Sequence, residues 1–162
     1  MKMNTAISVI TILALVGLLL LRPTKEKIVY KTPPVDEYTS ENVFEYINMY
    51  RNNNGLNTLS KSDALCRYAT LRAYETDNYW NFADPHYKFK EDYENGNWLN
   101  PRYKMIFEIL VKNHEVKLSP YEYFDLWRNS EEHNKIMLMK DFNYMCVSCV
   151  NKTCAGVFSA DK

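Results

Sequence analysis

The sequence predicts an α+β domain, with helices around a small antiparallel sheet, preceded by one N-terminal transmembrane helix. Three patterns predict this architecture. Apolar residues recur at helical spacing after helix-start signals near residues 39, 60 and 119. Alternating residues and a two-residue turn predict strands between residues 103 and 160. Residues 5–21 form a mostly apolar run that differs from the rest of the chain.

This apolar run begins at Thr5, ends at Leu21 and consists mostly of Ile, Leu, Val and Ala. Its length lies near the short limit for a helix that crosses a bilayer, for which about 20 apolar residues are typical. No A-x-A cleavage pattern follows it, so we expect an uncleaved signal anchor in residues 1–27 rather than a cleaved signal peptide. Positive charge flanks both ends and is slightly larger on the C-terminal side, which would keep the domain in the cytoplasm.

Residues 28–38 contain a Pro-Pro pair and no helical period, so we expect a short, stiff linker before a domain that spans residues 39–162. A helix is predicted from Thr39 or Ser40. It should end in residues 52–55, where Gly55 suits a left-handed cap. The apolar face of this helix consists of Val43, Phe44, Ile47 and Tyr50.

A second helix is predicted from Ser60, because Asp63 completes an S-x-x-D start. Its inner face consists of Leu65, Tyr68, Ala69, Arg72 and Ala73, with Cys66 beside it. Residues 79–100 show no lasting period and predict a long loop, with one helical turn around residues 88–93. Loops of this length in compact domains often carry function.

Residues 103–111 alternate between the two faces of an extended chain and predict a strand. Residues 142–150 and 153–160 predict two more strands, joined by a two-residue turn at Asn151-Lys152. Between these regions, Ser119 and Glu122 form a capping-box pattern with Pro120 at the first helical position. An aromatic stripe follows, and it consists of Tyr123, Phe124 and Trp127. Ser130 is a second helix start, which places His133 in the first turn of the next helix.

The four cysteines allow three interpretations. With a turn at Asn151-Lys152, Cys149 faces Cys154 in a non-hydrogen-bonded pair, where a cross-strand disulfide can form. Cys66 and Cys146 are then left for a second disulfide, which favours an oxidising compartment outside the membrane. The alternatives are a zinc knuckle built on the C-x-x-C pair and four reduced, buried cysteines in a cytoplasmic domain.

The residues resemble the CAP superfamily, also called the SCP domain, over about residues 40–160. In the first half the landmarks are Asn48, Arg51, Gly55, Leu56, Leu59, Leu65, Ala69 and Ala73. In the second half, Trp127, Ser130, His133, Met137 and Leu138 match the W-x-x-S-x-x-H segment of bacterial members. The resemblance implies an α-β-α sandwich around a small antiparallel sheet.

The resemblance also implies a central cleft with two histidines and two acidic residues, in which some members bind a divalent metal. His133 matches the second histidine, and Glu108 matches the glutamate of a G-E-N strand whose neighbours are altered here. At the first histidine position this chain has Asp84, with His86 two residues later. Ser130 replaces the second acidic residue, and Glu131 is the nearest substitute. The candidate ligands for zinc or a similar divalent ion are His86 or Asp84 together with Glu108 and His133.

Three functions follow from these patterns. The first is a membrane-anchored, extracytoplasmic binding or interaction module at the cell surface, for a lipid or protein ligand. The second is a metal-dependent hydrolase that uses the modified cleft, and the third is a degenerate scaffold without catalysis. Twenty basic and twenty acidic residues cancel, so the charge gives no reason to expect nucleic acid as a partner.

Overall fold

The computed structural model of the chain describes residues 34–95 and 103–161. Within these residues no helix is both long enough and apolar enough to cross a membrane. The predicted transmembrane helix between Thr5 and Leu21 lies outside the described residues, as does most of the predicted linker.

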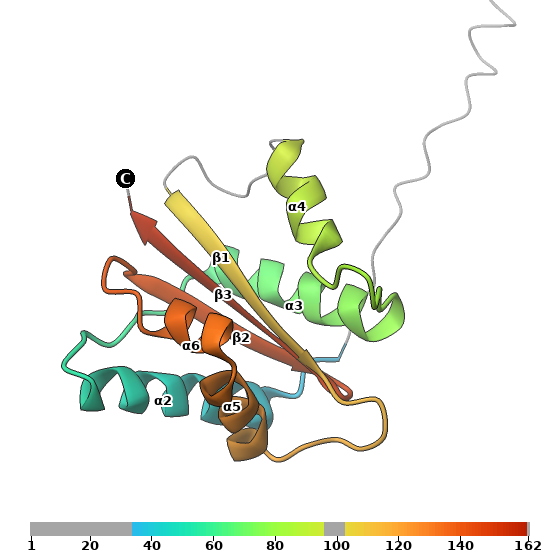
Figure 1. The fold of residues 1–162 in the computed structure, drawn as a ribbon, viewed down its shortest axis with the longest axis horizontal. Helices are drawn as coiled ribbons and strands as arrows, with labels where there is room; N and C mark the ends of the chain where they lie inside the picture. Colours follow the sequence, from blue (N-terminus) through green and yellow to red (C-terminus); the bar gives the residue numbers. More distant parts are fainter. Residues whose placement is uncertain (1–33, 96–102, 162) are drawn as a thin grey trace, which may run out of the picture. The chain divides into compact units, whose positions relative to one another are not determined.

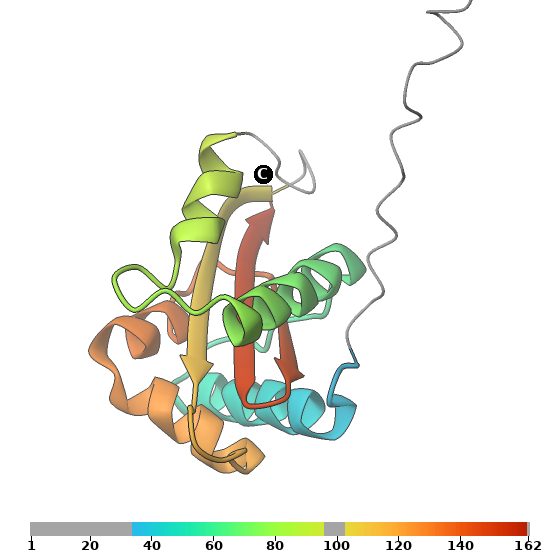
Figure 2. The same ribbon diagram turned by 90° about the vertical axis from the view of Figure 1, so that its right-hand side faces the viewer.

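The described part of the chain forms an α+β sandwich around a three-stranded antiparallel sheet, with strand order β1-β3-β2 (Figure 1). The helices are α2 (Glu37–Asn53), α3 (Asp63–Asn78), α4 (Tyr87–Glu94), α5 (Pro120–Asn129) and α6 (Glu131–Met137). The strands are β1 (Tyr103–Lys112), β2 (Tyr144–Val150) and β3 (Thr153–Asp161). Helices α2, α5 and α6 cover one face of the sheet, and α3 covers the other with α4 beside it (Figures 1 and 2).

The two faces of the sheet follow from the alternation of side chains along each strand. On one face Ile109, Val147 and Phe158 pack against the aromatic stripe of α5, in which Tyr123 and Trp127 are fully buried. On the other face Cys146 and Val157 pack against the inner side of α3. Each face therefore buries its own apolar cluster, as predicted for a sheet covered on both sides.

Helices α2 and α3 both begin at residues other than the predicted ones. Helix α2 begins at Glu37, two residues before the predicted start, because the side chain of Asp36 accepts a hydrogen bond from Thr39 N (3.2 Å). The predicted start of the next helix at Ser60 was wrong, since α3 begins at Asp63. The backbone of Ser60 instead bridges Tyr144 in parallel, with Ser60 N donating to Asn143 O (3.0 Å). This extended pairing keeps Ser60 out of the helix.

The capping box at the start of α5 is confirmed, with Ser119 and Glu122 bonded reciprocally and Pro120 in the first turn. Ser130 ends α5 and begins α6 in an extended conformation (φ −89°, ψ 121°), although its side chain makes no cap bond. The kink turns α6 away from the direction of α5 and fixes the placement of His133.

The cysteines form two disulfides, Cys66–Cys146 and Cys149–Cys154, so both predicted pairs are confirmed. Cys149 faces Cys154 across the hairpin, whose turn at Asn151 has a positive φ of 51°. A zinc knuckle and reduced cysteines are both inconsistent with this pairing, which leaves no free cysteine.

Candidate functional site

Glu108 lies in the middle of β1, on the face that packs against α3, and its side chain is only 1% exposed. One carboxylate oxygen, Oε2, accepts a hydrogen bond from Arg72 Nε at 2.6 Å. The other, Oε1, lies 2.8 Å from His86 Nδ1. Both oxygens of this buried carboxylate are therefore engaged by side chains from two other elements.

Arg72 reaches Glu108 from α3, on the same helix face as the apolar residues Tyr68 and Ala69. Its side chain is 1% exposed and also pairs with Glu75 one turn along the helix. Burial lowers the pKa of the Arg72 guanidinium and is the largest single influence on it, but the charge and hydrogen bond of Glu108 and the charge of Glu75 together outweigh burial and raise this pKa. Arg72 is thus a fixed positive charge between two carboxylates. Burial raises the pKa of Glu75, against the opposing effect of Arg72.

His86 stands at the N-cap position of α4, within residues 79–100, for which the sequence predicts a long loop. Its side chain is 33% exposed and is oriented by Glu108 through Nδ1. Since a carboxylate only accepts hydrogen bonds, Nδ1 carries the proton in this contact and Nε2 is the nitrogen left free of Glu108. Arg72, Glu108 and His86 form one chain of polar contacts from the interior to the surface.

His133 lies on α6, which packs on the opposite face of the sheet from α3. Burial lowers the pKa of His133, and the nearby His86 lowers it further. The imidazole of His133 is therefore neutral at neutral pH. Glu132, the neighbouring carboxylate, opposes this shift only weakly.

These side chains share a cleft of about 270 Å³ between α4 and α6, with β1 as its floor. The lining consists of His86, Phe89, Lys90, Phe107, Glu108, Glu132, His133 and Ile136. Three of the five predicted cleft residues, His86, Glu108 and His133, are brought together. The walls combine three apolar side chains with polar groups, of which Glu108 is buried and His133 is half-buried.

Asp84 and Glu131 do not contribute to this lining. The carboxylate of Asp84 bonds to Lys90 Nζ (2.7 Å) and to the backbone N–H of His86 (3.0 Å), so it shapes the loop beside the cleft. Glu131 is exposed, and Glu132 lines the cleft instead. Glu132 lies four residues before Ile136, so both fall on the inner side of α6.

The sequence did not identify Arg72 and Glu132 as residues of the site, nor the lining residues Phe89, Lys90, Phe107 and Ile136. The signal for Arg72 was present, because a charged residue stood on the otherwise apolar face of a predicted helix. Such a residue needs a buried partner of opposite charge. The choice of Glu132 over Glu131 depends on the rotation of α6, which the sequence pattern left open.

The residues present do not fit a divalent metal. Both oxygens of Glu108 already accept hydrogen bonds, one from Arg72 and one from His86, and the positive charge of Arg72 disfavours a cation beside this carboxylate. Among the described residues no group of three or more His, Cys, Asp or Glu side chains could hold a metal ion. A metal at His86, Glu108 and His133 would have to share the carboxylate of Glu108 with Arg72 and His86.

The described lining of the cleft offers no hydroxyl or thiol nucleophile. Within the described part of the chain, the residues that line it include no serine, threonine or cysteine. All four cysteines are held in disulfides. The polar groups can bind and orient a ligand, and His86 and His133 can exchange protons with it.

Comparison with known proteins agrees with the fold. The family model described as "CAP: Cysteine-rich secretory protein family" matches residues 44–160. No curated protein sequence matches the chain.

Solved structures match over most of the chain. A cysteine-rich secretory protein from Staphylococcus aureus aligns with a TM-score of 0.62 at 18% identity, over 79% of this chain and 40% of that protein. An extracellular protein containing an SCP domain from Bacillus anthracis aligns with a TM-score of 0.64 at 18% identity, over 76% and 41%. An outer surface protein from Borrelia burgdorferi aligns with a TM-score of 0.62 at 15% identity, over 78% and 95%. The chain thus spans about two fifths of the first two proteins and nearly all of the third.

Proposed function

The chain belongs to the CAP family of cysteine-rich secretory proteins, and on that premise we propose that it is a membrane-anchored binding module whose domain works outside the cytoplasm. The location is supported by the two disulfides, which are typical of oxidising compartments. It is also supported by the similar proteins, two of which are described as extracellular or outer surface proteins. The anchor is the apolar run between Thr5 and Leu21.

The observation that carries the binding role is the state of Glu108. A catalytic carboxylate needs an oxygen that can reach a metal, a proton or a substrate, whereas both oxygens of Glu108 are used inside the protein. The carboxylate instead holds His86 in one orientation at the cleft wall. A preorganised wall of this kind favours ligand binding, because little side-chain entropy is lost when the ligand arrives.

Photo-crosslinking tests the binding role. We would place benzoylphenylalanine at Lys90, on the cleft rim, and as a control at Met49, which is exposed on α2 and does not line the cleft. In cells that carry the full chain, we expect a discrete adduct from position 90 and none from position 49. Equal crosslinking from both positions, or none from position 90, would contradict a ligand in the cleft.

Location is tested on the same cells. Protease added from outside should degrade the domain, and alkaline carbonate should leave the undigested full chain in the membrane fraction. A domain protected from external protease would support the cytoplasmic orientation that the basic residues after Leu21 favour.

A metal-dependent hydrolase is the competing function, since two histidines do share the cleft. It predicts zinc-dependent hydrolysis of peptide or ester substrates by the full chain, abolished by His133→Ala. The binding role predicts no zinc-dependent turnover in either protein. Turnover that requires both zinc and His133 would replace the binding role with the hydrolase.

A further inference from the structure

The two outer strands of the sheet differ in how their free edges are covered. On β2, Met145 N donates to Ser60 O (3.0 Å) and Cys149 N donates to Ser40 Oγ (2.9 Å). In addition, Asp36 N donates to Cys149 O (2.8 Å). The outward main-chain groups of β2 are therefore bonded by residues before, within and after α2.

The register of the sheet shows which main-chain groups of β1 point outward. Just beyond the strand, Asn113 N donates to Lys152 O at 3.0 Å, which marks the pair 113–152 as hydrogen-bonded. Pairs alternate along an antiparallel ladder, and the register is unbroken back to Ile106 opposite Ser159. Ile106, Glu108 and Leu110 therefore direct their N–H and C=O groups away from β3.

No hydrogen bond to these outward groups is found within residues 34–95 and 103–161. A bare row of donors and acceptors is a template for another extended chain, and natural proteins usually cover or interrupt it. Here the edge of β1 that carries these main-chain groups forms the bottom of the cleft. The walls of the cleft are formed by α4 on one side of β1 and by α6 on the other.

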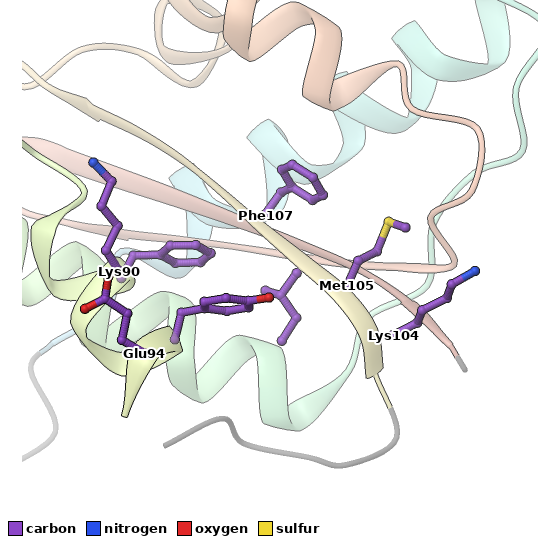
Figure 3. A pocket seen from close by; sticks show the side chains of 8 residues that line it. Lys90, Glu94, Lys104, Met105 and Phe107 are labelled. Atoms are coloured by element: carbon purple, nitrogen blue, oxygen red, sulfur yellow. The ribbon is translucent and has the colours of Figure 1, made fainter. Parts of the chain in front are cut away.

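The cleft continues along the same edge into a second hollow of about 360 Å³ (Figure 3). This hollow is lined by α4 and by four consecutive residues of β1, and it shares Phe89, Lys90 and Phe107 with the cleft. Consecutive strand residues point to opposite faces, so a hollow lined by Lys104, Met105 and Ile106 together must lie at the strand edge. The two hollows form one groove along β1, which we call the β1-edge groove.

We propose that the β1-edge groove binds an extended peptide segment of a partner protein, which pairs with β1 as an additional strand. This inference deepens the proposed binding role and rests on it. Only an extended polypeptide offers main-chain groups for Ile106 and Glu108 together with side chains for the apolar walls of the groove. The five residues from Lys104 to Glu108 span roughly 14 Å, which suits a segment of about five residues.

The groove also specifies the side chains of this peptide. Both faces of the peptide strand should carry apolar side chains, because Met105 and Phe107 lie on one side of the edge and Ile106 on the other. An acidic group is favoured beside the exposed Lys104. A fatty acyl chain would also fit the apolar walls, but it cannot satisfy the outward main-chain groups of β1.

The test uses a library of random linear heptapeptides displayed on phage and selected on the full chain in phospholipid nanodiscs. Selected peptides are synthesised and titrated against wild type, Ile106→Pro and the matched control Ile106→Val. Proline removes the outward N–H of residue 106 without removing a bond to β3, and edge positions of this kind tolerate proline. Valine keeps both the N–H and an apolar side chain. We expect similar affinity for wild type and Ile106→Val, and a loss of tenfold or more for Ile106→Pro.

A second measurement keeps the test valid if Ile106→Pro does not fold. N-methylation of single peptide amides should weaken binding to wild type at every second position, because alternate amides face β1. The proposal is wrong if no peptide binds wild type, if Ile106→Pro binds equally well, or if methylation lacks this alternation. A lipid adduct crosslinked from position 90 with no peptide binding would keep the binding role and reject the peptide. An absence of any adduct would reject both.

Discussion

The outer strands β1 and β2 flank the same central strand, but they are held in different ways. Strand β2 is fastened covalently and by main-chain bonds, since Cys146 links it to α3, Cys149 links it to β3, and Ser40 and Ser60 bond its outer edge. Strand β1 carries no cysteine, and the buried ion pair between Glu108 and Arg72 ties it to α3. The cleft lies beside β1, between α4 and α6. One edge of the sheet is thus closed for stability, while the other is left open where the candidate site lies.

The largest loss of stability should follow from removing a disulfide that holds β2. Replacing Cys66 and Cys146 together by alanine removes a link across 80 residues, whereas replacing Cys149 and Cys154 removes one across 5 residues. Chain entropy then predicts a loss in the free energy of unfolding of roughly 4 to 5 kcal/mol for the first pair and roughly 2 kcal/mol for the second. Urea unfolding followed by tryptophan fluorescence measures both. The reverse order would show that Cys66–Cys146 does not fasten β2 as described.

The next effect concerns the ion pair beneath β1. Arg72→Met leaves Glu108 as a buried charge without its strongest partner, which should cost about 3 to 5 kcal/mol. Adding Glu108→Gln removes that charge but keeps an acceptor for His86, so the double variant should be more stable than Arg72→Met alone. If the two losses simply add, Arg72 and Glu108 do not act as a pair.

A smaller effect is expected at the covered edge of β2. Ser40→Ala removes the acceptor for Cys149 N and should cost about 1 to 3 kcal/mol, because a buried N–H is left unbonded. Asn42→Ala is the matched control on the same helix, since its bond to Tyr38 O is exposed. Equal stability of the two variants would mean that the edge of β2 does not depend on Ser40.

The smallest expected effect is a pH dependence of stability that arises from His133, which lines the cleft beside β1. The lowered pKa of His133 means that the folded protein binds a proton less readily than the unfolded chain, whose histidine titrates at about 6.5. Stability should therefore decrease as the pH falls below this value, until the pH reaches the lowered pKa of the folded state. His133→Gln should reduce this loss between pH 7 and pH 5, as followed by thermal unfolding. An unchanged profile would place the titrating group elsewhere.

Much of the fold was predictable because local patterns and tertiary packing agree. The capping box at Ser119, the turn at Asn151 and the facing cysteines Cys149 and Cys154 each follow from short-range geometry. The start of α3 was not predictable in this way. Ser60 and Asp63 form a good capping pattern, but the parallel bridge from Ser60 to Tyr144 on β2 overrides it.

The site was predictable only in part. His86, Glu108 and His133 were identified through the resemblance to a family. Such a resemblance identifies positions in the sequence, but it does not show which side chains contact one another. That resemblance could not show that Arg72 takes one oxygen of Glu108, because this contact joins residues 36 positions apart in the sequence. It also could not show that the edge of β1 is open. Strand order and register decide that property, and neither is encoded in a local pattern.

Amide hydrogen exchange of the ligand-free full chain tests the contrast between the edges most directly. Ile106 N should exchange rapidly, while Met145 N and Cys149 N, which also point away from β3, should be protected by Ser60 and Ser40. Phe107 N, which bonds to β3, serves as the internal reference for an ordered β1. Fast exchange at Ile106 beside slow exchange at the other three amides is the result we predict. Protection of Ile106 equal to that of Met145 and Cys149 would mean that the edge of β1 is already covered, and it would contradict the account.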